Sequence, residues 1–488
     1  MKSLKYPAAI LTAVFIIACF TSCSDNKPSL TGDTVTTAAV TEAETDMNKP
    51  NLPAVTYSGE SLKILYTAPG VTYGENYLAA AEMDGEVIND AIYKRNTDIE
   101  DKYGIMLDMT PSENTPADSK KMIMAGESLD LVWMSMDACT SLALQDYLIN
   151  LAEVPYFDFT KPYWDNNAID QLSVRGITYM AVNDISPSML SGARFIFFNK
   201  YLIEQYNLSD PYELVNSNEW TIDNYISMVK SVSEDLNGDS KMDHNDRYGM
   251  LTEDCNLRFL LHGFGVRLTS NNAEGELELT FMSDFTVTAF EKLRELLLDK
   301  TVTLNYTDIQ KTAKTTGYDH VFAYARGALF AEDHFLFLQN GASVIEESFR
   351  TMEHDFGIVP NPKYDSSQDF YLTMTDPNFA VMCIPVTNSN PERTGIIAED
   401  WAYQSSGTVM NAYYEITLKN KTTRDEESAV MMDIIKDSLM YELTYAFPSV
   451  SFHGIIDGSI KNNTLVSDFA AKEASIRAKI EELFADAD

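Results

Sequence analysis

The sequence predicts an α/β protein built from mostly parallel β-sheets with helices on their faces. Beyond a polar N-terminal segment, short apolar runs typical of buried strands alternate with amphipathic helical stretches. A strand, helix, strand, helix order favours a parallel sheet that is covered on both sides. The chain has 488 residues, which is much longer than one compact domain, so we expect two or more lobes.

The first strands and the first long helix show this alternation. LKILY at 62–66 has the length of a buried strand, and IMLDM at 105–109 and LDLVWMSM at 129–136 are predicted as further strands. Before the second of these, one helical face carries Ile88, Ala91, Ile92, Arg95 and Ile99. Gly104 stands where it would end this helix. Open sheets of this kind bind ligands at the carboxyl ends of their strands.

The composition describes a folded and strongly acidic protein. Hydrophobic residues make up 45 % and charged residues 22 % of the chain, which is ordinary for a globular protein. Lys and Arg number 36 against 73 Asp and Glu, a formal net charge of -37. This charge repels nucleic-acid phosphates and anionic lipid headgroups, so we expect no nucleic-acid partner and a neutral or cationic ligand. Solubility alone is the alternative explanation of the charge.

The N-terminus predicts export and a lipid anchor. Residues 1–23 combine two early lysines with the apolar run AAILTAVFIIACF, which suits a signal peptide and is too short for a transmembrane helix. The run ends in FTSCSDN, which resembles the lipobox of bacterial lipoproteins and makes Cys23 the lipidated residue. Cys19 in IIAC, or cleavage without a lipid, are the alternatives. Residues 24–57 are rich in Thr, Ala, Asp and Pro without apolar periodicity, which indicates a flexible tether.

Motifs for catalysis are not found in the sequence. Cys139, Cys255 and Cys383 are scattered, so they predict buried hydrophobes rather than a disulfide framework or a thiolate metal site. The chain has no Gly-rich phosphate loop, zinc-protease helix or G-x-S-x-G elbow. We therefore predict a protein that is not an enzyme.

Six stretches carry a more specific resemblance. They are LDLVWMSMDACTSLALQDYLINL, FIFFNKYLIEQYNLSDPYELV, EWTIDNYISMVKSV, ARGALF, DFGIVPNPKYD and NSNPERTGIIAEDWAYQS. In order and spacing they resemble extracellular solute-binding proteins of the carbohydrate type, the maltose-binding-protein class of ABC transporter receptors. The resemblance extends from about Leu62 to the C-terminal region. It implies a periplasmic-binding-protein-like fold of two α/β lobes, joined by crossing strands as a hinge and closing on a ligand in the cleft.

This resemblance implies a domain organisation and a function. We expect lobe 1 to contain 58–183 and 322–375, and lobe 2 to contain 184–321 and 376–488. The protein is then a monomeric substrate-binding protein, lipid-anchored on the extracytoplasmic face of the cell membrane. It would capture a sugar or oligosaccharide by cleft closure and deliver it to ABC permease subunits. A secreted carbohydrate-active enzyme, a receptor for another polar solute, and an adhesin or sensor with the same fold remain alternatives.

The four tryptophans are predicted to be structural. Trp133 lies within a predicted strand, and Trp401 lies on an apparent helix. Trp220 precedes a helix that Thr221 is expected to cap. Trp164 matches a position that is usually structural in the resembled family.

Candidate ligand-binding residues are those that match the cleft of the resembled family. Sugar sites combine carboxylate or amide groups with aromatic rings. Met136 and Asp137 follow a predicted strand where the family places an acceptor for sugar hydroxyls, although Asp137 also suits a helix N-cap. The remaining candidates are Glu332, His334, Phe335, Asp376 and Asn378. A hydrogen-bonded core histidine is the alternative for His334.

The stretch DLNGDSKMDHND resembles a calcium loop of the EF-hand or dockerin type. The expected oxygen donors are Asp235, Asn237, Asp239, Asp243 and Asp246, with the carbonyl of Lys241. Ser240 stands where such a turn prefers Gly, and the terminal Asp is shorter than the usual Glu, so we expect modest affinity. We predict a structural calcium site remote from the cleft, with an acidic surface turn as the alternative.

Overall fold

The computed structural model describes residues 46–71, 77–273, 275–318, 320–349, 352–413, 426–447 and 452–483. The chain divides into two units, Met1–Met47 and Asn48–Asp488, and the fold is that of the second unit. The predicted signal peptide and Cys23 lie outside the described residues. Residues 48–57, predicted as the end of the tether, belong to the folded unit, where the Tyr57 amide donates to the Tyr103 carbonyl.

The first sheet has the strand order β12-β3-β1-β2. Its strands are β1 (Ser61–Thr67), β2 (Met106–Ser112), β3 (Leu131–Ser135) and β12 (Ala380–Cys383). β1 pairs in parallel with β2 and β3, and β12 runs antiparallel to β3. The three strands predicted from the sequence are therefore confirmed, and they pair as neighbours.

The second sheet has the order β10-β4-β9-β5-β8. Its strands are β4 (Phe195–Asn199), β5 (Tyr248–Thr252), β8 (Thr303–Asn305), β9 (Phe335–Asn340) and β10 (Phe356–Val359). β5 is parallel to β8 and β9, whereas β4 is antiparallel to β9 and β10. This sheet is mixed, because the direction of the chain reverses at β4.

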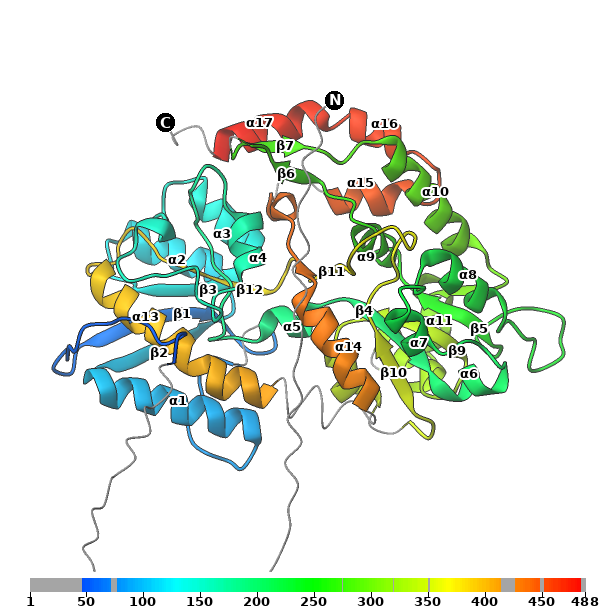
Figure 1. Cartoon of the computed structure of the whole chain (residues 1–488), viewed down its shortest axis with the longest axis horizontal. Helices are drawn as coiled ribbons and strands as arrows, with labels where there is room; N and C mark the ends of the chain where they lie inside the picture. The colour runs from blue at the N-terminus through cyan, green and yellow to red at the C-terminus, as the bar shows by residue number, and fades with distance from the viewer. Residues whose placement is uncertain are drawn as a thin grey trace, which may run out of the picture. The chain divides into compact units, whose positions relative to one another are not determined.

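Helices surround both sheets (Figure 1). They are α1 (Val87–Tyr103), α2 (Thr115–Met124), α3 (Met136–Ala143), α4 (Asn166–Leu172), α5 (Ser188–Gly192), α6 (Lys200–Gln205), α7 (Pro211–Asn216), α8 (Ile222–Lys230), α9 (Asn256–Gly263), α10 (Asp284–Leu298), α11 (Tyr306–Ala313), α12 (Val321–Tyr324), α13 (Pro391–Ser405), α14 (Glu426–Asp437), α15 (Phe452–Ser459), α16 (Leu465–Ala470) and α17 (Glu473–Leu483). In the described ranges, no helix combines the length and the apolar character needed to cross a membrane.

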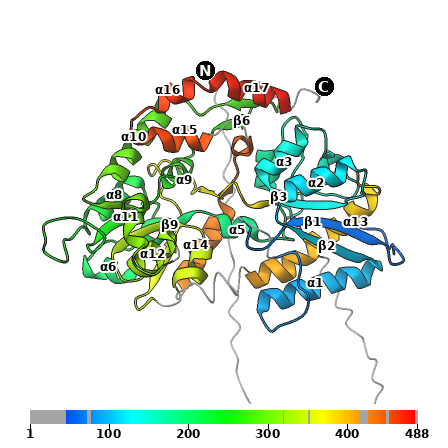
Figure 2. The ribbon, with the colours of Figure 1, turned by 180° about the vertical axis from the view of Figure 1, so that it is seen from behind.

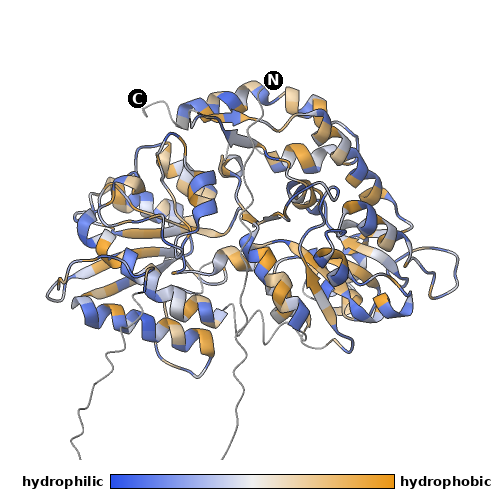
Figure 3. Ribbon diagram, viewed as in Figure 1, coloured by the Kyte–Doolittle hydropathy of each residue, from blue (hydrophilic) through white to orange (hydrophobic). Residues whose placement is uncertain are grey.

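Most residues of the strands are buried, except in the edge strand β2, where Met106 is exposed. Figure 3 shows the apolar character of the central strands. In β3, Trp133 points to one core and Met134 to another, because successive side chains of a strand alternate. The core that contains Met134 also contains Phe197 of β4. One apolar core is therefore shared by the two sheets.

The sequence predicts the local structure around the helix ends correctly. Gly104 ends α1 with φ 56°, a left-handed conformation that glycine adopts without strain. The Thr221 side chain caps α8 by accepting from the Asn224 amide. All four tryptophans are fully buried, and Trp133 packs edge-on against Trp401 with ring centroids 5.7 Å apart. Cys139 and Cys383 are buried in the shared core, as predicted, whereas Cys255 is only partly buried.

Two described segments cross between the sheets, one through α5 to β4 and one through β11 (Thr373–Met374) to β12. They meet in an antiparallel bridge between Ala193 and Thr375. β11 also pairs in parallel with β13 (Leu439–Met440). Figures 1 and 2 show α5 and α14 between the two sheets from both sides. The crossing strands predicted from the family resemblance are present.

Several segments of the C-terminal half join a different sheet from the one that their predicted lobe assignment implies. Residues 322–375 were expected in lobe 1, but β9 and β10 pair within the second sheet. Residues 376–488 were expected in lobe 2, but β12 pairs with β3, and α13 packs Trp401 against the first sheet. The reason is that the apolar run FLFLQN of β9 forms the centre of the second sheet, so the chain returns to the first sheet only after β11.

Candidate functional site

The carboxyl ends of β1, β2 and β3 surround a small hollow of about 150 Å³. Its lining residues are Thr67, Val71, Glu113, Asn114, Thr115, Pro116, Met134, Ser135 and Asn378. Asn378 comes from the segment that crosses back to the first sheet. Its amide donates to Asp376 Oδ1 over 2.8 Å. The crossing segment thus brings Asn378 and Asp376, both predicted site residues, to the ligand-binding edge of the first sheet.

Asp376 forms part of an ion cluster with Arg194 and Glu253. Arg194 Nη2 lies 2.9 Å from Asp376 Oδ2, and Nη1 lies 4.0 Å from Glu253 Oε1. Glu253 directly follows β5, so this cluster lies at the carboxyl edge of the second sheet. The side chains of Arg194 and Asp376 are only 12 % and 10 % exposed. Burial by itself raises the pKa of Asp376, but the charge and the hydrogen bond of Arg194 outweigh it and hold that pKa below its ordinary value.

A second arginine extends the cluster. Arg258 Nε lies 3.4 Å from Asp457 Oδ1, and the guanidinium groups of Arg194 and Arg258 lie 5.4 Å and 5.3 Å from the Phe259 ring. Burial raises the pKa of Asp457 to about 7, with Asp254 and Glu253 acting in the same direction and Arg258 opposing them. Asp457 therefore titrates near neutral pH.

His453 lies on the same helix as Asp457, one turn before it. Its ring stacks on Tyr445 with centroids 5.3 Å apart. Burial lowers the pKa of His453, and Arg258 lowers it further, while the carboxylates of Asp376 and Asp137 oppose this. The imidazole is thus held neutral between groups that come from both sheets.

His453 Nδ1 is buried and has no hydrogen-bond partner among the described residues, whereas Arg258 Nε and Asp457 Oδ1 form an ion pair at 3.4 Å without hydrogen-bond geometry. A buried polar group without a hydrogen bond costs roughly 1–3 kcal/mol. The free ring nitrogen and the loosely held ion pair are able to hydrogen-bond a polar ligand. We call Arg194, Glu253, Asp376, Arg258, His453 and Asp457 the cleft cluster.

The structure places Asp137 at the carboxyl end of β3, in the first turn of α3. Its carboxylate is exposed and accepts from the Ser135 hydroxyl. Ser135, not Asp137, occupies the N-cap position, so the alternative role of Asp137 as the cap is not observed. The effect of Asp137 on His453 places it near the cleft cluster. Met136 is 1 % exposed and packs in the shared core.

Glu332, His334 and Phe335 lie elsewhere. Phe335 pairs with Tyr248 at the start of β9, at the amino ends of the parallel strands β9 and β5, so these residues do not share the carboxyl edge with Asp376. Phe335 is 0 % exposed and stacks on Tyr248 in the core, and Glu332 is exposed. His334 Nδ1 lies 3.0 Å from the Asp246 carbonyl. They were expected beside the cleft because β9 was assigned to a crossing strand.

Several cleft groups were missed from the sequence. Glu253 and Asp254 directly follow the buried strand YGMLT, which is a usable signal because ligands bind at strand ends. Arg194 is the charged residue directly before the apolar strand FIFFN. His453 and Asp457 carry no such signal, since only the path of the C-terminal chain brings them to the cluster.

An aromatic surface lies next to the cleft cluster. Burial raises the pKa of Tyr306 to about 12, and Glu253 and Arg194 are among the charges that act on it. The Phe322 ring packs edge-on against Tyr306 at 5.0 Å, and Arg326 lies 5.2 Å from the Phe322 centroid. Phe322 is exposed, whereas every tryptophan is buried. The ring beside the cleft cluster that is open to a ligand is therefore a phenylalanine and not a tryptophan.

No known family profile matches the sequence, and no curated protein sequence matches it. Solved structures do resemble the fold. A sugar transporter from Rhizobium etli in an open conformation has a TM-score of 0.56 and 14% identity, covering 87% of this chain and 98% of that chain. A cyclo/maltodextrin-binding protein complexed with maltotetraose has a TM-score of 0.53 and 14% identity, covering 88% and 98%. An ABC transporter solute-binding protein from Thermotoga lettingae, bound with α-D-tagatose, has a TM-score of 0.50 and 14% identity, covering 87% and 100%.

The chain shares its fold with these solved structures. Each likeness covers nearly the whole neighbour, so the two-lobe fold predicted from the sequence is confirmed. In this fold the first sheet and the second sheet belong to different lobes, and the cleft cluster lies where groups of both lobes meet.

The predicted calcium loop precedes β5, at the amino end of that strand. Asp246 is buried and accepts from the amides of Leu236 and Asp243, while Asp235 accepts from the amides of Gly238 and Ser240. Ser240 adopts φ 65°, which explains why such a turn prefers glycine. Among the described residues, no three His, Cys, Asp or Glu side chains gather as metal ligands. A calcium ion at this loop stays a prediction.

We expect Asp457 to lower stability as pH rises. Its pKa is raised to about 7 in the folded protein, so its favourable contribution is complete below the unfolded pKa of about 4 and is lost toward pH 7. Asp457→Asn should therefore gain about 2–3 kcal/mol of stability relative to the wild-type protein between about pH 5 and pH 8. Urea unfolding of both proteins at the two pH values measures this. An unchanged difference between the proteins would contradict the raised pKa.

Calcium should stabilise the protein if the loop binds it. At free calcium about 100-fold above the dissociation constant, linkage adds about 2.7 kcal/mol of stability. Asp239→Ala should abolish the calcium-dependent rise in melting temperature, and magnesium should replace calcium poorly. Asp365→Ala, in another exposed acidic turn, is the control and should keep the rise. Identical melting of the wild-type protein with chelator and with millimolar calcium would show that the loop is only an acidic turn.

Proposed function

We propose that the protein is the substrate-binding subunit of an ABC importer and captures a neutral sugar or oligosaccharide between its two lobes. The observation that supports this most directly is the cleft cluster, in which the buried His453 Nδ1 has no hydrogen-bond partner among the described residues and lies beside the ion pair of Arg258 and Asp457. It lies in a fold whose solved neighbours include a protein complexed with maltotetraose and one bound with α-D-tagatose.

The chemistry of the cleft cluster suits sugar hydroxyls. Carboxylates such as Glu253 and Asp457 accept hydrogen bonds from hydroxyls, and arginine and a neutral histidine donate to them. The exposed Phe322 offers an apolar face for the C–H side of a sugar ring. A site with these three kinds of group fixes both the orientation and the face of a bound sugar.

Most charged groups of the cleft cluster form ion pairs with one another. Asp376 and Glu253 are paired with Arg194, and Asp457 is paired with Arg258. A glycoside hydrolase needs one carboxyl group as proton donor and another as nucleophile or base on opposite sides of the bond. Carboxylates held by arginines are better suited to accept hydroxyls than to attack, which favours binding over hydrolysis.

The location of the protein is part of the same proposal. Lipidation at Cys23 and the polar stretch that follows it would hold the folded unit at the extracytoplasmic face of the cell membrane. There the permease subunits would receive the closed, ligand-loaded lobes. The support for this part is the sequence of the leader and the receptor fold.

Replacing Glu253 by glutamine should weaken sugar binding. The change keeps the volume of the side chain and removes a charged acceptor, so we expect a loss of about 1–3 kcal/mol. Calorimetry with a panel of oligosaccharides measures the affinity, and product analysis of the same samples detects hydrolysis. Glu278→Gln, on the exposed strand β7 (Leu277–Leu279), is the matched control. Unchanged affinity in Glu253→Gln argues against this site, and hydrolysis by the wild-type protein argues for an enzyme.

Ligand binding should close the lobes. A sugar that contacts both lobes favours the conformation in which they are close, so the radius of gyration should fall. Small-angle scattering with and without a saturating oligosaccharide measures this change. A ligand that fills the site without contraction would rule out a hinged receptor.

A further inference from the structure

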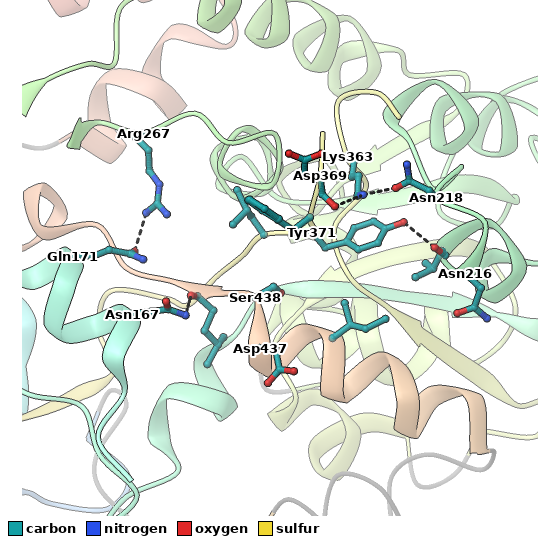
Figure 4. A pocket seen from close by; sticks show the side chains of 15 residues that line it. Asn167, Gln171, Asn216, Asn218, Arg267, Lys363, Asp369, Tyr371, Asp437 and Ser438 are labelled. Carbon is teal, nitrogen blue, oxygen red and sulfur yellow. Dashed lines mark hydrogen bonds between the residues drawn. The ribbon is translucent and has the colours of Figure 1, made fainter. Parts of the chain in front are cut away.

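A second hollow, of about 620 Å³, lies at the crossing strands and shares no residue with the cleft cluster (Figure 4). Its lining residues are Asn167, Gln171, Val215, Asn216, Asn218, Arg267, Lys363, Asp369, Phe370, Tyr371, Leu372, Ile434, Asp437, Ser438 and Leu439. We call it the hinge pocket. Its volume is within the range of roughly 300–1,000 Å³ that small-molecule sites occupy.

The hinge pocket has walls from both sides of the crossing strands. Asn167 and Gln171 come from α4, which packs with the first lobe, and Asn216 comes from α7 on the second sheet. Asn167 Nδ2 donates to the Leu439 carbonyl over 3.2 Å. Gln171 Oε1 accepts from Arg267 Nη1 over 2.9 Å. A molecule in this pocket would contact the first lobe, the crossing strands and the second lobe together.

The second-lobe wall is an ordered loop that presents an aromatic ring. Lys363 Nζ donates to the carbonyls of Gln368 and Asp369 over 2.9 Å and 3.3 Å and lies 4.5 Å from the Tyr371 ring centroid. Gln368 Nε2 donates to the Phe370 carbonyl over 2.9 Å. The Phe370 side chain is nevertheless 67 % exposed. Phe370 is one of the residues that line the hinge pocket, so its exposed ring is available for stacking by a ligand there.

The polar groups of the hinge pocket favour an uncharged ligand. Two cations, Arg267 and Lys363, are balanced by the carboxylates of Asp369 and Asp437. Beside them stand the carboxamides of Asn167, Gln171 and Asn216, which supply both donors and acceptors. Amide groups facing an aromatic ring match the hydroxyls and the apolar face of a sugar.

We propose that the hinge pocket is a second binding site, for a neutral sugar of about disaccharide size, and that its occupant controls closure. The physical link is the crossing strand itself, because Leu372 lines the hinge pocket and Asp376, four residues later, belongs to the cleft cluster. A sugar that bridges α4 and the 363–372 loop fixes the distance between lobes that must rotate about this strand. The proposal goes beyond the cleft and does not depend on which ligand the cleft binds.

The test uses Phe370→Ala with maltose, cellobiose and lactose as neutral probes. Loss of the stacking ring should weaken binding at the hinge pocket by about tenfold. Saturation-transfer NMR and calorimetry should show a binding event that Phe370→Ala weakens and Asp137→Ala, a cleft variant, retains. Tyr156→Ala, which removes an exposed ring outside the pocket, is the control and should behave as wild type. Asn216→Trp, which fills the pocket, should abolish the same event.

Three results would overturn the proposal. The first is equal binding of every neutral disaccharide to the wild-type, Phe370→Ala and Asn216→Trp proteins. The second is the absence of any Phe370-dependent binding. The third is tighter Phe370-dependent binding of digalacturonic acid or of a glucosamine disaccharide than of the neutral sugars. Asp137→Ala tests binding in the cleft, and Phe370→Ala tests binding in the hinge pocket. The two variants therefore distinguish a wrong cleft assignment from a wrong hinge-pocket assignment.

Discussion

The two sheets share no strand pair, so the backbone bonds between the crossing segments determine how their binding edges face each other. Ala193 and Thr375 form the bridge, the Arg194 amide donates to the Met374 carbonyl over 3.1 Å, and the Asp376 amide donates to the Gly192 carbonyl over 2.9 Å. A Cβ at Gly192 would lie 3.0 Å from the Thr375 hydroxyl, so a larger residue there would require the Thr375 side chain to shift slightly.

This bridge also positions the cleft cluster. Arg194 and Asp376 are the residues that follow the bridged pair on each segment, and their side chains form the ion pair at the centre of the cleft cluster. A rotation of the lobes about the crossing strands necessarily acts on a pair that is anchored to both of them. The same crossing segment contains Leu372, which lines the hinge pocket. The cleft cluster and the hinge pocket are therefore connected by one continuous stretch of backbone.

The acidic character of the chain fits a ligand without negative charge. The formal net charge is -37, and Asp137, Asp254, Glu253, Asp376 and Asp457 gather near only two arginines, Arg194 and Arg258. An anionic sugar would meet repulsion both from the protein as a whole and within the cleft. A neutral sugar avoids it, because its hydroxyls bind carboxylates through hydrogen bonds rather than through charge.

The helices and their ends could be predicted from the sequence because they depend on residues that are close together along the chain. The period of Ile88, Ile92 and Ile99 predicts α1, and Gly104 and Thr221 set helix ends through their own backbone and side-chain geometry. Asp376 and Asn378 were predicted near the cleft because they lie in the stretch MTDPNFAVMCIPV, which was expected to be a crossing strand. The assignment of Glu332, His334 and Phe335 to the cleft was wrong, because the apolar pattern of FLFLQN predicts a buried strand but not the sheet that this strand joins.

The sequence by itself determined the α/β class, the helix ends, the burial of the tryptophans and the two-lobe fold, because these follow from local periodicity and from ordered family-like stretches. Only the tertiary structure decided the binding cluster. Arg194 directly precedes β4 and Glu253 directly follows β5, while Arg258 lies on α9 and His453 and Asp457 lie on α15. These elements are far apart along the chain. These residues lie close together because of the strand order and the path of the crossing segments. Neither of these can be predicted from the spacing of residues in the sequence.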